Sequence, residues 1–127
     1  MTLPELQKMQ VYILGKLSGD PLAVVNSFRS AEEQLGEHGI HKRKSPFDDV
    51  ELEQRFQNMD AFEWNKVVRK CITQVMTCDA IILLPESDNR FCKDIISAAC
   101  SAEIPVIDMD YFRKILETTP KANAVPL

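Results

Sequence analysis

A short polar loop directly follows the most apolar segment of the chain. The side chains of this loop are of types that can bind a ligand or take part in catalysis. The run Ala80-Ile81-Ile82-Leu83-Leu84 contains no polar residue, and Pro85 ends it. Two acids, an amide and an arginine come next, namely Glu86, Asp88, Asn89 and Arg90, and Asp94 follows one helical turn later. Such groups can hydrogen-bond ribose hydroxyls or a phosphate. The loop is therefore a candidate ligand site, although its composition also fits an ordinary solvated loop.

A second candidate loop follows the first expected strand, residues 10–14. Gly15 and Gly19 bound this loop, Ser18 lies within it, and Asp20-Pro21 supplies an oxygen cap and a proline for the next helix. A glycine-containing loop before a helix N-terminus can bind an anion through free backbone N–H groups. The glycine spacing matches neither a dinucleotide fingerprint nor a P-loop, so a purely structural turn is the alternative.

Three further side chains are weaker candidates. Asp79 comes immediately before the apolar run, where it can either act on a ligand or satisfy backbone donors in a turn. Trp64 and Arg69 lie on the helix expected before that strand. Their ordinary interpretations are core packing for the tryptophan and a surface charge for the arginine.

The elements that must position these residues alternate along the chain. Strands are expected at residues 10–14, 40–43, 80–84 and 104–107, and helices at 20–36, from near Asp60 to 76, at 90–102, and after Asp110, which we expect to cap the last helix. Strands that alternate with helices predict a parallel sheet with right-handed crossovers. We therefore expect an α/β flavodoxin-like three-layer sandwich, with about four strands in the order 2-1-3-4 and helices on both faces.

In this strand order, the ligand crevice lies between the first and third strands at their carboxyl ends. The loops after Leu14 and Leu84 are therefore expected to face each other. The length of 127 residues suits a single domain. We assign residues 1–9 to an N-terminal extension, 10–117 to the domain and 118–127 to a flexible C-terminal tail.

Composition and charge narrow the class of protein. A net charge of -4 argues against a nucleic-acid binder. No apolar stretch approaches the roughly 20 residues of a membrane span, and the first residues lack the features of a signal peptide, so we expect a cytoplasmic protein. The four cysteines show no CxxC spacing, and the two histidines lie far from them. We therefore expect no disulfide, no metal and no cofactor, and no hydrolytic triad can be recognised.

Four segments along the chain carry a family resemblance. They are Val11-Tyr12-Ile13-Leu14-Gly15-Lys16-Leu17-Ser18-Gly19, then Phe28…Ala31-Glu32…Leu35…Gly39, then Trp64…Arg69…Cys78-Asp79-Ala80-Ile81…Leu84-Pro85, and then Ile104-Pro105-Val106-Ile107. Together they resemble the nucleoside 2-deoxyribosyltransferase-like superfamily, and within it a small, largely uncharacterised bacterial and phage branch. The resemblance covers nearly the whole expected domain.

The resemblance implies an activity and a set of roles. Characterised members use a glutamate after the third strand as the nucleophile that forms a glycosyl-enzyme intermediate, which is retaining glycosyl transfer. A tyrosine upstream positions that nucleophile, an aspartate opening the third strand handles the base, and a neighbouring subunit often completes the site. The matching residues here are Tyr12 and Asp79, and a nucleoside or nucleotide ligand and a homo-oligomer are implied.

The nucleophile and its surroundings depart from the family pattern. An ungapped comparison places Ile95 at the glutamate position, and Asp94 takes the role after a shift of one residue, with Asp88 then matching the second acid of the family's pair. The substrate-facing glycine is replaced by Arg90, Phe91 or Cys92, depending on register, and a proline after the first strand is replaced by Lys16.

Two functions are therefore expected from the sequence. The first is a divergent deoxyribosyltransferase-like protein that binds a nucleoside or nucleoside 5′-monophosphate, with N-glycosyl transfer or hydrolysis weak or lost. The alternative is a non-catalytic oligomeric interaction or scaffold module in which bulky side chains fill the old crevice. A phosphorylatable receiver domain is disfavoured, because proline rather than aspartate follows Leu84.

Overall fold

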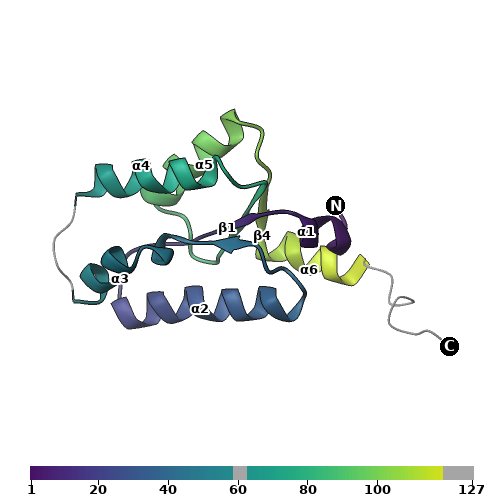
Figure 1. Ribbon diagram of the computed structural model, residues 1–127, viewed down its shortest axis with the longest axis horizontal. Coiled ribbons are helices and arrows are strands. Elements are labelled where there is room, and N and C mark those ends of the chain that lie inside the picture. The colour runs from purple at the N-terminus through teal and green to yellow at the C-terminus, as the bar shows by residue number, and fades with distance from the viewer. Residues whose placement is uncertain (59–62, 119–127) are drawn as a thin grey trace.

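The computed structural model of the protein describes residues 1–58 and 63–118. Helices and strands alternate along these residues (Figure 1). In chain order the elements are α1 (Leu3–Lys8), β1 (Val11–Leu14), α2 (Pro21–Glu37), β2 (Arg43–Lys44), the 3-10 helix η1 (Pro46–Asp48), α3 (Val50–Gln57), α4 (Trp64–Val75), β3 (Ala80–Leu83), α5 (Arg90–Ser101), β4 (Val106–Asp108) and α6 (Met109–Thr118).

A parallel sheet of four strands in the order β2-β1-β3-β4 forms the middle layer. Strands β1 and β3 pair from Val11 with Ala80 to Leu14 with Leu83. Every residue of β1 is buried, and so are the first three of β3. Such uninterrupted burial is typical of strands covered by helices on both faces. The flavodoxin-like α/β fold and the strand order 2-1-3-4 are confirmed.

Helices form the two outer layers. Helices α4 and α5 pack against each other on one side of the sheet, and α2 and α6 lie on the other side (Figure 1). The rings of His38, at the end of α2, and Phe112, in α6, meet edge to face with centroids 5.9 Å apart. This arrangement follows from right-handed crossovers, because the chain moves across the sheet in one direction from β1 to β2 and in the opposite direction from β2 to β3 and β4.

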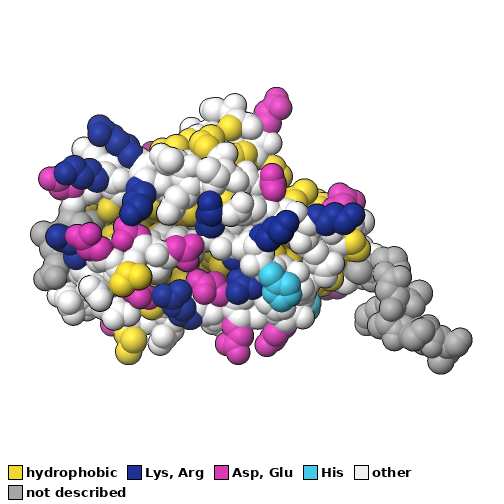
Figure 2. Space-filling view, in the orientation of Figure 1, with side chains coloured by type: hydrophobic (Ala, Val, Ile, Leu, Met, Phe, Trp, Pro, Cys, Tyr) yellow, Lys and Arg dark blue, Asp and Glu magenta, His cyan; other side chains and the backbone are white. Residues whose placement is uncertain are grey.

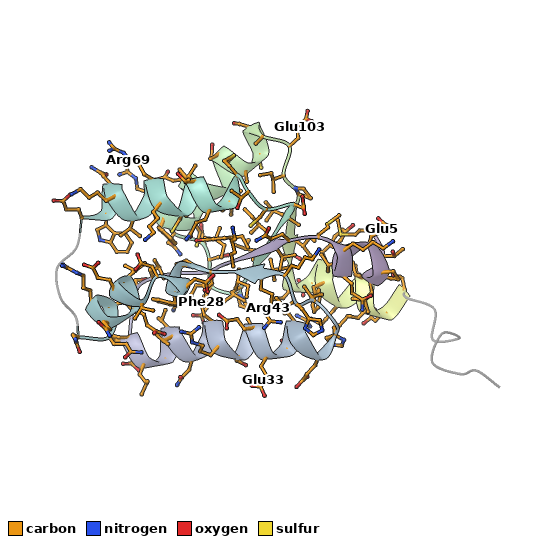
Figure 3. All side chains as sticks on the ribbon, viewed as in Figure 1. Glu5, Phe28, Glu33, Arg43, Arg69 and Glu103 are labelled. Atoms are coloured by element: carbon orange, nitrogen blue, oxygen red, sulfur yellow. The ribbon has the colours of Figure 1, made fainter. Side chains whose placement is uncertain are left out.

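Helix α2 shows how the sequence selects its buried face. Asp20 caps the helix by accepting a hydrogen bond of 3.3 Å from the backbone N–H of Ala23, and Pro21 occupies its first turn. Phe28 points from α2 toward the sheet, whereas Glu33 points away from it (Figure 3). Phe28 then meets Phe47 of η1 edge to face, with ring centroids 5.0 Å apart. The apolar stripe of α2 thus joins the main hydrophobic core.

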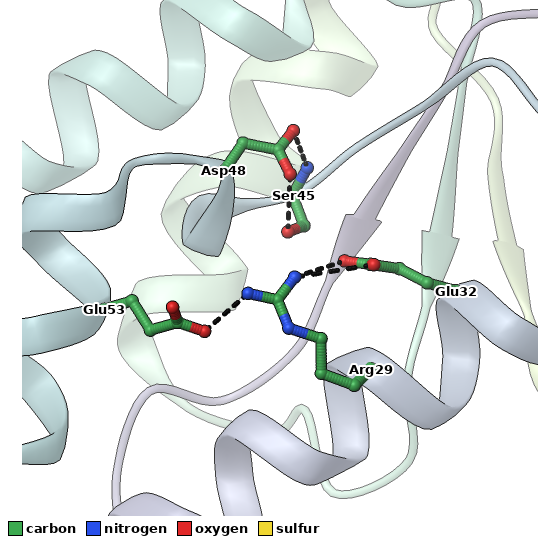
Figure 4. A network of polar contacts seen from close by, with 5 residues as sticks. All are labelled: Arg29, Glu32, Ser45, Asp48 and Glu53. Atoms are coloured by element: carbon green, nitrogen blue, oxygen red, sulfur yellow. Dashed lines mark hydrogen bonds and ion pairs between the residues drawn. The ribbon is translucent and has the colours of Figure 1, made fainter.

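A polar network ties α3 to α2. Arg29 of α2 donates hydrogen bonds to Glu32 on its own helix and to Glu53 of α3 (Figure 4). Beside it, the backbone N–H of Ser45 donates to Asp48 Oδ2 over 3.0 Å, which closes the turn of η1. These contacts hold the segment after the short edge strand β2 against the body of the domain.

The first nine residues, expected as an extension, contain a helix that the sequence analysis did not predict. Thr2 accepts a hydrogen bond of 3.3 Å from the backbone N–H of Glu5 and so caps α1. Leu6 is fully buried in the core, and Gln7 Nε2 donates to the carbonyl of His38 over 2.9 Å. Helix α1 therefore packs with the domain.

Two expected boundaries were wrong. Strand β2 is Arg43–Lys44 instead of 40–43, because Ile40 is buried in the core and its carbonyl accepts a hydrogen bond from the Arg43 guanidinium. The last helix begins at Met109, since Asp108 and not Asp110 accepts the backbone N–H of Tyr111 over 2.8 Å.

Other differences are small or lie outside the described residues. Strand β4 is Val106–Asp108 and so ends one residue after the expected range. The helix start expected near Asp60 and the tail after Thr118 lie outside the described residues.

Charges of both signs are interspersed over the face of the molecule drawn in Figure 2. No single-sign area dominates that face. None of the helices in the part of the chain that the structure describes is long and apolar enough to cross a membrane.

Gly15 is required by packing at the end of β1. A Cβ atom at this position would lie 3.2 Å from Leu84 Cβ and 3.2 Å from Phe28 Cζ. Both neighbours belong to the buried core, so neither can move away freely. The glycine therefore permits the close approach of the two loops that follow β1 and β3.

Substituting Gly15→Ala is expected to lower the free energy of unfolding by about 1–3 kcal/mol, the usual cost of overpacking a core. The comparison is Gly36→Ala within α2, where the added methyl meets the end of the Arg43 side chain at 3.1 Å, a guanidinium that donates to the Ile40 carbonyl. That change should cost less stability than Gly15→Ala, because the end of a long side chain shifts more easily than buried core atoms and alanine is favoured over glycine inside a helix by about 1 kcal/mol. Urea unfolding of both variants measures the difference, and a Gly15→Ala protein as stable as the wild type would contradict the packing argument.

Candidate functional site

A cavity of about 700 Å³ lies where α4 and α5 begin, and we call it the α4–α5 cavity. Its lining residues come from the loop after β1, from the first turns of α4, and from the start of α5. They are Leu17, Ser18, Trp64, Asn65, Val68, Arg69, Asn89, Arg90, Phe91 and Asp94. Six of the residues selected from the sequence are thus brought together, namely Ser18, Trp64, Arg69, Asn89, Arg90 and Asp94.

The topology explains why these segments meet. In a parallel sheet each helix runs back against its neighbouring strands, so the N-termini of α4 and α5 lie at the carboxyl ends of β1 and β3. Asn89 fixes the start of α5 by accepting a hydrogen bond of 3.0 Å from the backbone N–H of Cys92. Helices α4 and α5 then pack along each other, which leaves their first turns as two walls of the cavity.

The polar wall of the cavity has two cations and one anion. Arg90 Nε lies 3.7 Å from Asp94 Oδ2, and the two side chains are 94% and 50% exposed. Arg69 projects from α4 on the side away from α2 (Figure 3). The amides of Asn65 and Asn89 add hydrogen-bond donors and acceptors.

The apolar wall is aromatic. The rings of Trp64 and Phe91 lie 5.8 Å apart with their planes inclined by 58°. Phe91 is nearly buried, whereas Trp64 is 45% exposed, so the indole can still offer a face to a flat ligand. The three bulky residues expected to crowd the site, 90–92, therefore lie in different places. Phe91 forms part of the cavity wall, Cys92 is buried in the core, and the Arg90 side chain reaches solvent.

The crevice directly between β1 and β3 is much smaller. A cavity of about 310 Å³, the β1–β3 cavity, is lined by Gly15, Ser18 and Glu86 among the expected residues. Lys16 Nζ and Glu86 Oε2 form an ion pair of 2.7 Å across it. The hydrogen bond from Lys16 holds the pKa of Glu86 below its usual value. The two loops do face each other, as expected, but they are joined to each other and leave little room.

Asp88 and Gly19, both expected at the site, line neither cavity. Asp88 pairs with Lys93 at 2.9 Å on the outer side of the loop. Gly19 has a φ of 99°, a left-handed conformation that favours glycine, in the turn before α2. Asp88 is therefore placed as a surface ion-pair residue and Gly19 as a turn residue.

Asp79 lies at the opposite end of the sheet. Its carboxylate accepts a hydrogen bond of 2.9 Å from the backbone N–H of Gln10, and its own N–H donates to the Gln10 carbonyl over 2.7 Å. These contacts join the amino ends of β1 and β3, a full strand length away from the α4–α5 cavity. The structure therefore gives Asp79 a local structural role and does not bring it to the candidate site.

Tyr12 is buried beneath α4. Its hydroxyl donates to Gln74 Oε1 over 3.1 Å, and no hydrogen bond joins it to Asp94 among the described residues. Burial, and then the nearby Cys71 thiol, raise the pKa of Tyr12 far above its usual value. Tyr12 and Asp94, paired by the family resemblance, are thus held by different partners.

A third cavity of about 640 Å³, the α3–α4 cavity, was not foreseen from the sequence. Lys70 of α4 pairs across it with Asp49 at 2.6 Å, and the hydrogen bond from Lys70 lowers the pKa of Asp49. Cys71 and Gln74 line it next to Tyr12. This space depends on the relative positions of α3 and α4, so no local sequence motif predicts it.

Asn65 and Val68 of the α4–α5 cavity were not predicted from the sequence. Trp64 and Val68 are four residues apart, as are Asn65 and Arg69, so the four side chains share one side of α4. That spacing was visible in the sequence. The orientation of this side toward the start of α5 was not, because it depends on how the two helices pack.

Among the described residues, neither a cluster of metal ligands nor an ionised Cys92 thiol is indicated. No group of three or more His, Cys, Asp or Glu side chains in that part of the chain is placed to hold a metal ion. Burial raises the pKa of Cys92 to about 11, so its thiol stays protonated near neutral pH. The candidate chemistry is therefore that of carboxylate, guanidinium, amide and aromatic groups.

The fold and the cavity define a flavodoxin-like α/β protein with a polar and aromatic cavity at the carboxyl edge of its sheet. The chain belongs to the family described as Domain of unknown function (DUF4406), whose model matches residues 9–90. The match runs from just before β1 to the first residue of α5, so Asp94 lies beyond it. No curated protein and no solved structure matches the chain.

The buried Tyr12 phenol should not ionise while the protein is folded. In a Tyr111→Phe variant, Tyr12 is the one remaining tyrosine, so ultraviolet absorbance of phenolate during alkaline titration reports it alone. Because the folded pKa of Tyr12 exceeds the unfolded value of about 10, the stability that its burial contributes should be fully present below that pH and be lost as pH rises above it. Phenolate absorbance should therefore appear together with loss of the circular dichroism of the fold. Ionisation near pH 10 with the fold intact, as expected in urea, would contradict the burial.

Proposed function

We propose that the protein binds a nucleoside or nucleoside 5′-monophosphate in the α4–α5 cavity, and that N-glycosyl transfer or hydrolysis by it is weak or lost. The observation that carries the proposal is the composition of this cavity. It sets an exposed indole and a phenyl ring beside two guanidinium groups, two amides and one carboxylate. A nucleotide presents the complementary surfaces, namely a flat base, sugar hydroxyls and a phosphate.

Size and stacking support this class of ligand. A volume of about 700 Å³ lies within the range of about 300–1,000 Å³ that is usual for small-molecule sites. Stacking of a base on an aromatic side chain contributes about 1–3 kcal/mol in nucleic-acid binding. Trp64 offers such a face, and the amides of Asn65 and Asn89 can hydrogen-bond a base edge or a ribose.

The arrangement of the carboxylates supports weak or lost catalysis. Retaining transfer needs a carboxylate held against the anomeric carbon of the sugar. Asp94 is half-exposed and its partner is Arg90, while the hydroxyl of Tyr12 is engaged by Gln74. Ile95, at the ungapped position of the family nucleophile, is fully buried in the core. Among the residues that the structure describes, no carboxylate at this cavity is hydrogen-bonded to Tyr12.

One observation favours the alternative, a non-catalytic scaffold module that forms a homo-oligomer. The crevice beside Gly15 is narrowed by Leu84 and Phe28 to about 310 Å³ and is crossed by the Lys16–Glu86 ion pair. A ligand crevice reduced in this way fits a protein whose fold serves assembly. The binding experiment below separates the two proposals, and light scattering of the purified protein measures the number of subunits.

Binding is expected to change the fluorescence of Trp64, the single tryptophan of the chain. Titration with nucleosides and nucleoside 5′-monophosphates should give a saturable change, since a base stacked on the indole alters its emission. A parallel thermal-shift measurement at about 100 times the dissociation constant should show stabilisation by about 2.7 kcal/mol.

The variant Asn65→Leu should weaken this binding about 2- to 10-fold, the loss expected for one hydrogen bond. Asn26→Leu is the matched control, because Asn26 is an exposed asparagine inside α2 that lines none of the cavities. Absence of any saturable change with every ligand would refute nucleoside binding and leave the scaffold proposal ahead.

Turnover is expected to be slow or absent. Chromatography of the same mixtures should show little free base, and any release should vanish in Asp94→Ala. That variant should lose no more than about 0.5 kcal/mol of stability, the value of an exposed ion pair one turn apart on a helix. Asp110→Ala, which removes a similar helical pair with Arg113, is the control. Rapid base release, or release that Asp94→Ala leaves unchanged, would refute the assignment.

A further inference from the structure

The α4–α5 cavity is electropositive within an acidic protein. The lining contains two arginines, Arg69 and Arg90, and one carboxylate, Asp94, so its formal charge is +1. The whole chain carries a net charge of -4. A local excess of positive charge in a concave site concentrates anionic ligands. The cavity therefore favours an anion over a neutral molecule of the same shape.

Two helix N-termini add to this potential. Helices α4 and α5 have 12 residues each, and both begin at the cavity with Trp64 and Arg90. The N-terminal turn of a helix carries a partial positive charge from its backbone N–H groups and stabilises an anion. Glu63, the residue before α4, makes no side-chain capping hydrogen bond to it.

Arg90 stands where helix electrostatics disfavour a cation. It is the first residue of α5, and a positive charge at this end repels the helix dipole. Asp94 relieves the repulsion only in part, because the pair is 3.7 Å apart and the guanidinium is 94% exposed. An exposed ion pair of this kind contributes little to stability and is easily broken. The side chain is thus free to exchange its partner for a stronger one.

We propose that Arg90 makes the site selective for nucleoside 5′-monophosphates over nucleosides, an inference that rests on the proposed function. Its guanidinium leaves Asp94 and pairs with the phosphate at the N-termini of α4 and α5, while Arg69 supplies the second cation. A bidentate arginine–phosphate pair is shorter and stronger than the single contact that it replaces. Arg90, one of the three residues that can stand at the position of the family's glycine, is thereby a specificity-determining residue.

The test compares one nucleoside with its 5′-monophosphate by Trp64 fluorescence at fixed ionic strength. The wild type should bind the monophosphate at least about 10-fold more tightly, the usual effect of a charge-assisted hydrogen bond. Arg90→Ala should bring the two affinities together by weakening the monophosphate and sparing the nucleoside. Arg90→Lys should keep part of the preference, because lysine retains the charge without the planar fork.

Two further variants check the partner exchange. Asp94→Asn should tighten monophosphate binding, since it removes both the competing partner of Arg90 and a charge that repels the phosphate. Lys93→Ala is the matched control, because it removes a positive charge from the same helix turn but from a side chain that pairs with Asp88 outside the cavity. The monophosphate preference should survive in Lys93→Ala.

Equal affinity of the wild type for nucleoside and monophosphate would overturn the role of Arg90 while leaving the nucleoside site standing. A preference that persists in Arg90→Ala, or that is lost equally in Lys93→Ala, would also overturn it. Absence of binding of either ligand would refute the site itself, and with it this inference.

Discussion

Strands β1 and β3 pair in parallel along buried, almost wholly apolar sequences, and this pairing sets the position of everything else. Removing both strands from water on both faces requires helices above and below them, which the chain supplies as α4 and α5 on one side and α2 and α6 on the other (Figure 1). Because the strands are parallel, the loop after each one emerges at the same edge. The N-termini of the returning helices arrive at that edge too, so polar side chains from distant segments meet there.

The same close pairing explains why the larger cavity does not lie directly between the two strands. Gly15 lets Leu84 and Phe28 approach the end of β1, and the Lys16–Glu86 ion pair then links the two loops. Apolar packing thus narrows the crevice in which this type of fold usually holds its ligand. The larger space lies between the first turns of α4 and α5, where the rings of Trp64 and Phe91 form one wall.

The charged groups of the α4–α5 cavity determine which ligands it favours. An arginine at the first position of a helix is unfavourable by itself, and its weak pair with Asp94 compensates little. Such local conflicts between a residue and its element are expected mainly at functional positions. Tyr12 shows the opposite condition, since its phenol is fully buried and its hydroxyl is satisfied by Gln74. Residues that resemble one catalytic pair in sequence therefore lie in unlike surroundings.

The sequence by itself determined the sheet, its strand order and the edge at which polar residues would gather, because apolar runs such as Ala80–Leu84 and the capped start at Asp20-Pro21 are local signals of burial and helix initiation. It also indicated six residues of the α4–α5 cavity. Helix α1 escaped prediction, since a short helix is stable only through the packing of a residue such as Leu6, and the cap at Asp108 was missed because Asp110 is an equally suitable capping residue by type. Only the tertiary structure decided that the hydroxyl of Tyr12 bonds to Gln74 and that Asn65 lines the same cavity as Arg90. Those relations depend on distances between segments far apart in the chain, which no local pattern encodes.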